Sequence, residues 1–239
     1  MTRPGRMIGV GLGPGDPDLV TLKAARAIGA AQVVAYPALP GAPSFARQIA
    51  APHMRADARE IVIEIPITTE RGPAQAGYDA GAARIADALD TGTDVVVLCE
   101  GDPFFYGSFM YLHARLSARY DVEVIPGITS VAAASAALHL PLTARNEVLS
   151  ILPAPLDSET LRIRMEMADS FSIMKLGRHI SRIRTLLDNL GLGDNARYIE
   201  RATLPEQRIL PLDDAPDPAP YFSMILVTKG ADPWLNLPS

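Results

Sequence analysis

The chain has 239 residues, of which 48% are hydrophobic and 21% are charged, as is ordinary for a soluble globular protein. Its net charge of −5 argues mildly against a nucleic-acid binder, although a few arginines in one cleft would suffice for an anionic small molecule. No stretch approaches the roughly 20 uninterrupted apolar residues that span a bilayer, and the single cysteine, Cys99, excludes a disulfide framework.

Strand and helix patterns alternate along the first half of the chain. The clearest is the continuous apolar run 94–99, which predicts a strand buried on both faces. Thr21 precedes a helical pattern and is placed to cap it. We expect further strands at 7–10, 32–36 (stopped by Pro37), 61–65 and 122–125, and helices over 21–31, 79–89 and 109–118.

The second half repeats this alternation, which predicts α/β layering. We expect helices over 128–138 and 180–190, strands at 148–152, 171–176, 196–200 and 221–228, and an acidic, proline-rich loop over 211–220. A boundary near residues 119–121 would give an N-terminal domain, 1–119, and a C-terminal domain, 120–239, both of ordinary size for a domain.

A glycine-rich run, with glycines at 9, 11, 13 and 15, follows the first predicted strand. It is not a dinucleotide-binding fingerprint, because the third glycine position holds Pro14 in one register and Asp16 in the other. It is not a phosphate-binding P-loop either, because no Gly-Lys-Ser/Thr follows. By itself the run predicts a tight turn between a strand and a helix.

Two other strand ends carry residues that are unusual for a core. The strand ending at Cys99 runs into a loop, 100–108, with carboxylates, glycines and aromatic residues, and the strand 122–125 runs into 126–130. There, Gly127 would let a ligand approach the backbone, and Thr129 and Ser130 offer hydroxyls, unless Ser130 only caps the next helix. Because ligands of open α/β sheets bind at the carboxyl ends of strands, the three loops together predict a shared cleft.

The single cysteine and the four histidines give no sign of a metal site. The histidines are not spaced like metal ligands, either from one another or from Cys99, so we expect no protein-built zinc site. The two arginines near the amino terminus are followed by the glycine run and not by an apolar segment, so we expect no signal peptide and a reducing cytoplasm.

Several of these stretches together resemble the tetrapyrrole (corrin and porphyrin) methyltransferase family. The matching pieces are residues 10–24, 101–107 and 124–130, with weaker matches at 174–177 and 200–203. The resemblance implies a class III methyltransferase fold of two α/β domains with mixed sheets and a cofactor cleft between them. It also implies S-adenosyl-L-methionine as the methyl donor, S-adenosyl-L-homocysteine as its product, and a homodimer with no nucleic-acid or membrane partner.

Within this family, the stretches 107–116, 126–137 and 148–153 resemble most the members that methylate precorrin-2 at C-20 to give precorrin-3A in cobalamin biosynthesis. The alternatives within the family are C-20 methylation of cobalt-factor II, methylation of another tetrapyrrole position, diphthine synthesis, and ribosomal RNA ribose methylation, which the acidic balance disfavours. A non-catalytic tetrapyrrole carrier is a different class of function, and the intact glycine and Gly-Asp-Pro loops argue against it.

The resemblance also implies roles for individual residues. The N-terminal domain would serve mainly the substrate and the C-terminal domain mainly the cofactor. The residues matched to the cofactor site are Pro14, Gly101, Asp102, Tyr106, Thr129, Ser130, Leu176, Ala202 and Thr228.

Two of these residues have competing interpretations. Asp102 would meet the cofactor ammonium or would orient its own loop through an Asx-turn. Tyr106 is the first candidate for a polar contact near the reacting carbon, and the alternative is that it only packs in the cofactor loop. No metal or covalent nucleophile is needed, because the macrocycle supplies an electron-rich carbon and the protein supplies alignment.

Basic residues should pair with the carboxylates of the substrate. Five of them lie near predicted strand ends or loops, and the sequence does not rank them: Lys23, Arg71, Arg145, Lys175 and Arg178.

Overall fold

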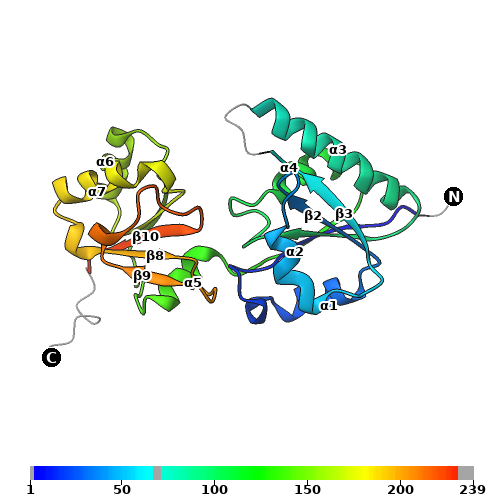
Figure 1. Ribbon diagram of the computed structural model, residues 1–239, viewed down its shortest axis with the longest axis horizontal. Coiled ribbons are helices and arrows are strands. Elements are labelled where there is room, and N and C mark those ends of the chain that lie inside the picture. The colour runs from blue at the N-terminus through cyan, green and yellow to red at the C-terminus, as the bar shows by residue number, and fades with distance from the viewer. Residues whose placement is uncertain (1–2, 67–70, 231–239) are drawn as a thin grey trace. The chain divides into compact units, whose positions relative to one another are not determined.

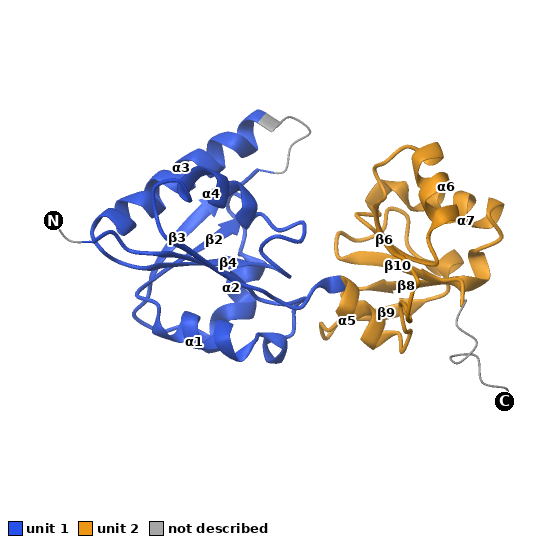
Figure 2. Cartoon of the chain, turned by 180° about the vertical axis from the view of Figure 1, so that it is seen from behind, with its two compact units in different colours: residues 1–130 blue, residues 131–239 orange. Residues whose placement is uncertain are grey.

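The computed structural model describes residues 3–66 and 71–230. The chain divides into two compact units, Met1–Ser130 and Val131–Ser239, shown in different colours in Figure 2. The boundary expected at residues 119–120 is therefore too early. The reason is that the strand Val122–Ile125 pairs with the first strand of the chain, which keeps it in the first unit.

The first unit is built on a five-stranded sheet with the order β3-β2-β4-β1-β5 (Figure 1). Every pairing in it is parallel, so the expectation of a mixed sheet is wrong for this unit. The strands are β1 (Met7–Gly11), β2 (Val33–Ala38), β3 (Arg59–Glu64), β4 (Val95–Cys99) and β5 (Val122–Ile125).

Helices cover both faces of this sheet, which is why β1 and β4 are buried throughout. On one face, α1 (Leu22–Ala30) and α2 (Phe45–Ala50) contribute to a core with Val10 and Leu98. On the other, α3 (Arg71–Asp90) and α4 (Phe109–Leu116) contribute to a core with Met7 and Val97. Figure 1 shows α1 and α3 on opposite sides of the strands.

The second unit holds a five-stranded mixed sheet with the order β6-β7-β10-β8-β9. β6 and β7 are parallel, and the other pairs are antiparallel. Its strands are β6 (Leu149–Pro153), β7 (Ser170–Met174), β8 (Ala196–Glu200), β9 (Arg208–Leu210) and β10 (Ser223–Thr228), and the helices are α5 (Ser130–Ala137), which begins in the first unit, α6 (Ser158–Met167) and α7 (Ile180–Asn189).

Most predicted helices and strands are present, and residues 3–66 and 71–230 contain three additional α-helices and strands. The additional elements are α2, α6 and β9. The Thr21 hydroxyl caps α1 as expected, since it accepts a hydrogen bond from the amide of Ala24 at 3.2 Å. The region 211–220 is mostly loop and contains one 3-10 turn, Leu212–Asp214.

Pro37 does not end β2 as predicted, because the strand continues to Ala38. The pairing of β2 with β4 covers only Val33 to Ala35, whereas its pairing with β3 continues to Ala38. At Pro37 the strand is therefore bonded on one side only, where the missing amide hydrogen is tolerated.

Candidate functional site

The topology of the first sheet predicts a ligand-binding crevice at the carboxyl end of β4. The chain leaves β1 and β2 towards α1 and α2 on one face, whereas it leaves β4 towards α4 on the other face. β4 lies between β2 and β1 in the sheet. Adjacent strands whose connections depart to opposite faces leave a space above the sheet edge, which is where open α/β sheets bind ligands.

The glycine-rich run joins the loop after β4 at this edge. Gly13 and Gly101 exchange two backbone hydrogen bonds, with N–O distances of 3.1 and 2.8 Å. The amide of Leu12 donates to the carbonyl of Cys99 at 2.9 Å, which continues the contact between β1 and β4. The run therefore extends the sheet beyond its last strand residues and ties the first loop to the second.

Gly11 and Gly127 are needed for contact between backbones. A side chain at Gly127 would place its Cβ 2.0 Å from the carbonyl oxygen of Gly101, and one at Gly11 would place it 2.5 Å from the amide nitrogen of Gly127. The expectation that Gly127 leaves room for a ligand is therefore wrong, since the space beside its Cα is filled by the loop after β4.

Gly101 provides the open position instead. It has a φ of +64°, which favours glycine, and no atom lies within 4 Å of where a Cβ would be. Pro14 lies half-buried in the adjoining loop. A ligand can therefore reach the main chain at Gly101, on the loop that the topology places at the crevice.

The Asp102 carboxylate is engaged by backbone amides. Its Oδ1 accepts hydrogen bonds from Phe104 at 2.9 Å and Phe105 at 3.1 Å, which makes an Asx-turn. Its Oδ2 accepts a hydrogen bond from Gly127 at 3.0 Å. Of the two interpretations of Asp102, this arrangement favours loop orientation, and it extends to the loop after β5 as well.

Tyr106 stands at an exposed and strained position in the same loop. Its φ is +56°, a conformation that is uncommon for a residue with a side chain, and its exposed fraction is 45%. Its ring lies edge-on to that of Phe105, with the centroids 5.2 Å apart. Strained backbone of this kind concentrates at functional sites, which is consistent with the role expected for Tyr106.

Thr129 and Ser130 follow β5 and are both half-buried. Ser130 is the first residue of α5 and the last of the first unit. The first unit thus brings six of the predicted cofactor residues onto the loops after β1, β4 and β5: Pro14, Gly101, Asp102, Tyr106, Thr129 and Ser130.

In the second unit, Leu176 and Ala202 follow β7 and β8. These two strands are parallel to each other, because both are antiparallel to β10, so their carboxyl ends lie at the same edge. Leu176 is fully buried and belongs to the core of this unit. Lys175 (φ +60°), Arg201 (φ +51°) and Thr203 (φ +73°) put three residues in the left-handed region at this edge.

A buried carboxylate anchors the loop that holds Ala202. The Glu200 carboxylate accepts a hydrogen bond from the Tyr198 hydroxyl at 2.8 Å and is paired with Arg208 at 3.2 Å and with Arg201 at 3.3 Å. Burial and the bond to Glu200 raise the pKa of Tyr198. This network holds the end of β8 in place beside Ala202.

Thr228 is not brought together with Leu176 and Ala202. It is the last residue of β10 and pairs with Ser170, the first residue of β7. Its carbonyl accepts a hydrogen bond from Asn195, which precedes β8. Within the second unit, Thr228 therefore lies at the edge of the sheet opposite to the loops after β7 and β8.

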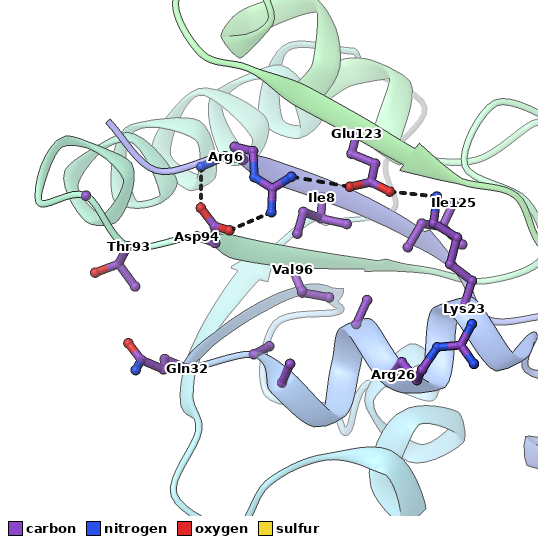
Figure 3. A pocket seen from close by; sticks show the side chains of 14 residues that line it. Arg6, Ile8, Lys23, Arg26, Gln32, Thr93, Asp94, Val96, Glu123 and Ile125 are labelled. Atoms are coloured by element: carbon purple, nitrogen blue, oxygen red, sulfur yellow. Dashed lines mark hydrogen bonds and ion pairs between the residues drawn. The ribbon is translucent and has the colours of Figure 1, made fainter. Parts of the chain in front are cut away.

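Lys23 lies in a pocket of about 550 Å³ on the α1 face of the first sheet (Figure 3). Its ammonium is 2.7 Å from Glu123, and Arg6 is paired with both Asp94 and Glu123. The lining also includes Thr93 and other residues around the amino ends of β1 and β4. The pocket is thus separate from the loops at the carboxyl ends, and the Lys23 charge is already balanced within it.

Of the other predicted basic residues, Arg145 and Lys175 lie in loops, whereas Arg178 lies in the 3-10 turn Gly177–His179. Arg145 has a φ of +50° and is exposed in the loop before β6. Lys175 and Arg178 are exposed after β7. Arg71 is the first residue of α3, and its side chain lies outside the described residues.

Glu100, immediately after β4, was not among the predicted site residues. Its only signal in the sequence is a carboxylate directly after a buried strand. Burial raises the pKa of this carboxyl group, and a hydrogen bond from the backbone amide of Ala46 opposes that shift. Glu100 is half-buried at the crevice beside Gly101.

These loops fit the amino-acid end of the expected cofactor. The space beside Gly101 is open because this residue has no Cβ. Backbone groups and hydroxyls around it can form hydrogen bonds with an ammonium and a carboxylate. Within residues 3–66 and 71–230, no group of three or more His, Cys, Asp and Glu side chains is placed to hold a metal ion. In the same part of the chain, no helix is both long and apolar enough to cross a membrane.

A model of one known protein family matches most of the chain. The model described as Tetrapyrrole (Corrin/Porphyrin) Methylases matches residues 6–216. The cobalamin biosynthesis protein CobIJ of Mycobacterium tuberculosis is 46% identical over 96% of this chain and 47% of its own length. The chain therefore spans about half the length of that relative.

A second relative is covered from end to end. The precorrin-2 C(20)-methyltransferase of a Sinorhizobium species is 41% identical over 95% of this chain and 97% of its own length. Among solved structures, uroporphyrin-III C-methyl transferase from Thermus thermophilus, complexed with S-adenosylhomocysteine, has a TM-score of 0.67 and 24% identity over 93% of this chain and 97% of that one. At this identity, the likeness concerns the fold.

Proposed function

Because this chain belongs to the tetrapyrrole (corrin/porphyrin) methylases, we propose that it transfers a methyl group from S-adenosylmethionine to C-20 of precorrin-2, giving precorrin-3A in cobalamin biosynthesis. The observation that carries the proposal is the 41% identity to a precorrin-2 C(20)-methyltransferase over 97% of that protein's length. We place the reaction in the cytoplasm and expect a homodimer.

The loops of the first unit would hold the cofactor. S-adenosylmethionine supplies, when bound, an electrophilic methyl group on a sulfonium. The main chain at Gly101 and Pro14 would contact the amino-acid end, and the hydroxyls of Thr129 and Ser130 would satisfy its charged groups. In the second unit, the main chain at Ala202 would read the adenine, and the buried side chain of Leu176 would support the wall beside it. Thr228 is left out, because it lies at the other edge of its sheet.

The chain's own contribution to the reaction would be alignment. An electron-rich meso carbon needs no covalent protein nucleophile, so the rate depends on how well the methyl group and the carbon are held in line. Asp102 would act as a positioning residue through the amides of Phe104, Phe105 and Gly127. Tyr106 would present its hydroxyl from a strained and exposed position.

The exposed basic residues outside the pocket would pair with substrate carboxylates. Arg145 and Lys175 lie in loops and have positive φ angles, and Arg178 lies in the 3-10 turn after β7. Lys23 lies outside these loops, in the pocket at the amino ends of β1 and β4, where its ammonium is 2.7 Å from Glu123. Charge-assisted hydrogen bonds of this kind fix the position of a polycarboxylate.

Two measurements test the proposal. Calorimetry should detect binding of S-adenosylhomocysteine, and incubation of the purified protein with precorrin-2 and methyl-labelled cofactor should transfer the label to the tetrapyrrole. A protein that binds precorrin-2 but transfers no label would instead be a carrier. Faster transfer to cobalt-factor II than to precorrin-2 would favour the cobalt-containing substrate.

A further inference from the structure

We propose that Glu100 is the base that accepts the proton lost from C-20 during methyl transfer. This inference rests on the proposed function, and it gives a role to a carboxylate that the binding of the cofactor does not require. Four features of the first unit carry it: the place of Glu100 in the topology, its surroundings, the engagement of other carboxylates nearby, and the chemistry of the step.

Glu100 stands at the carboxyl end of the central strand of the sheet. It directly follows β4, and Gly101 comes next with open space beside its Cα. The connections of the two strands beside β4 leave by the opposite face, so the crevice opens at this strand end. A carboxylate in this place is adjacent to the main chain that a bound ligand would touch.

The surroundings of Glu100 provide one hydrogen bond from the main chain. The amide of Ala46, in α2, donates to its carboxylate. On this face, Arg47 of α2 and Tyr36 of β2 are both hydrogen-bonded to Glu60 of β3. In α1, Lys23 is paired with Glu123 of β5, and Arg26 lines the pocket that holds Lys23. The adjacent thiol of Cys99 is buried in the core on the other face.

The acidic residues of the neighbouring loops already serve as structural acceptors. Asp102 accepts three backbone hydrogen bonds. Asp16 caps a 3-10 turn by accepting a hydrogen bond from the amide of Asp18 at 2.9 Å. Glu100 accepts one backbone hydrogen bond as well, and it differs from Asp102 and Asp16 in directly following the central strand β4.

Burial supports the assignment, because it raises the pKa of Glu100 above the usual value of 4.5. A carboxylate is a stronger base when its pKa is higher, and a catalytic base works best with a pKa near the working pH. The half-buried position still leaves part of the residue accessible.

The step balances without any further reactant. The electron pair of the C-20 double bond forms the new bond to the methyl carbon, and the bond from that carbon to the sulfonium sulfur breaks. Its electrons remain on sulfur, which becomes a neutral thioether. The C-20–H bond then breaks, its electrons restore the double bond of the macrocycle, and the proton goes to a carboxylate oxygen of Glu100.

The test compares the rate of methyl transfer in the wild-type protein and in Glu100→Gln. Each protein is first loaded with S-adenosylmethionine, and a single turnover is then followed after the tetrapyrrole is added. The substrates are precorrin-2 and precorrin-2 deuterated at C-20. We expect Glu100→Gln to bind S-adenosylhomocysteine as the wild type does, to form the final chromophore about 100-fold more slowly, and to show a primary deuterium isotope effect absent from the wild type. Glu100→Asp, which keeps a carboxylate, should recover part of the rate.

The matched control is Glu64→Gln, the same substitution at the exposed carboxyl end of the parallel strand β3. It should leave the rate and the isotope effect unchanged. If Glu100→Gln matches the wild type in both, or if Glu100→Asp is no faster than Glu100→Gln, the base is not Glu100. If the wild type itself transfers no methyl group to C-20, the proposed function fails and the assignment of the base falls with it.

Discussion

Oδ2 of Asp102 accepts a hydrogen bond from the amide of Gly127 at 3.0 Å, and this bond links the loops after β4 and β5. The other oxygen of the same carboxylate closes an Asx-turn in its own loop. One side chain therefore sets the shape of two of the three loops at the carboxyl edge of the first sheet.

Asp102→Asn should break the link between the loops selectively. The Asn oxygen can still accept from Phe104 and Phe105, but the amide nitrogen would face the N–H of Gly127, so two donors would meet. We expect a loss of about 2 kcal/mol in the free energy of unfolding and weaker binding of S-adenosylhomocysteine. Urea unfolding and calorimetry measure the two effects.

The control for this substitution is Asp18→Asn, at an exposed carboxylate of a nearby 3-10 turn. It should change neither quantity. If Asp102→Asn lowered cofactor affinity and left the stability unchanged, Asp102 would contact the ligand directly and would not serve to hold the loops.

Gly127→Ala should be strongly disruptive, because its Cβ would lie 2.0 Å from the carbonyl oxygen of Gly101. One of the two loops must then move. We expect a loss of at least about 2 kcal/mol of stability, together with loss of binding to S-adenosylhomocysteine. Gly72→Ala is the control, since no atom lies within 4 Å of its added Cβ. A Gly127→Ala protein of normal stability would contradict the close approach of these backbones.

Glu100→Gln should change the pH dependence of stability. Because burial raises the pKa of Glu100 in the folded protein, the folded state binds this proton more tightly than the unfolded chain does. The wild type therefore gains stability from Glu100 as the pH falls from that raised pKa towards 4.5, and it loses this contribution as the pH rises.

The variant has no such group, so its stability relative to the wild type should be greatest at neutral and higher pH and should decrease as the solution is acidified. Urea unfolding of both proteins at a series of pH values gives this difference, without substrate or cofactor. A difference that stays constant with pH would show that burial does not perturb Glu100.

Tyr106→Phe tests the role of the hydroxyl alone, because it removes this group and keeps the ring. The edge-on contact with Phe105 and the loop conformation should persist, since only the hydroxyl is removed. We expect unchanged stability and unchanged affinity for S-adenosylhomocysteine, with several-fold slower methyl transfer under saturating substrate. Full turnover in this variant would assign Tyr106 to packing in the loop.

Much of the fold could be predicted from local sequence patterns. The strands β5 and β8 have the predicted bounds. Pro126 and Gly127 directly follow β5, and turn residues of this kind mark the end of a strand. α6 escaped prediction because its apolar residues are few, and its stability depends on burying Leu161 and Met165 and on the Asp157 cap. The pairing of β5 with β1, which sets the boundary between the units, depends on contacts between distant parts of the chain.

The candidate site could be predicted less completely. The sequence indicated which loops follow the strands, and the topology places those of the first unit at one edge. The sequence could not indicate which atoms surround each glycine. We expected Gly127 to leave room for a ligand, but in the structure the open position is at Gly101. The sequence also could not separate Thr228 from Leu176, since both end strands and only the antiparallel pairing puts them at opposite edges.

The most direct test of the central claim is a carbon NMR experiment. The purified protein is incubated with precorrin-2 and S-adenosylmethionine that carries a ¹³C label in its methyl group, and the isolated tetrapyrrole is examined. We expect one new labelled methyl group, attached to C-20. Label at any other carbon, or an unlabelled tetrapyrrole from protein that binds both ligands, would contradict it.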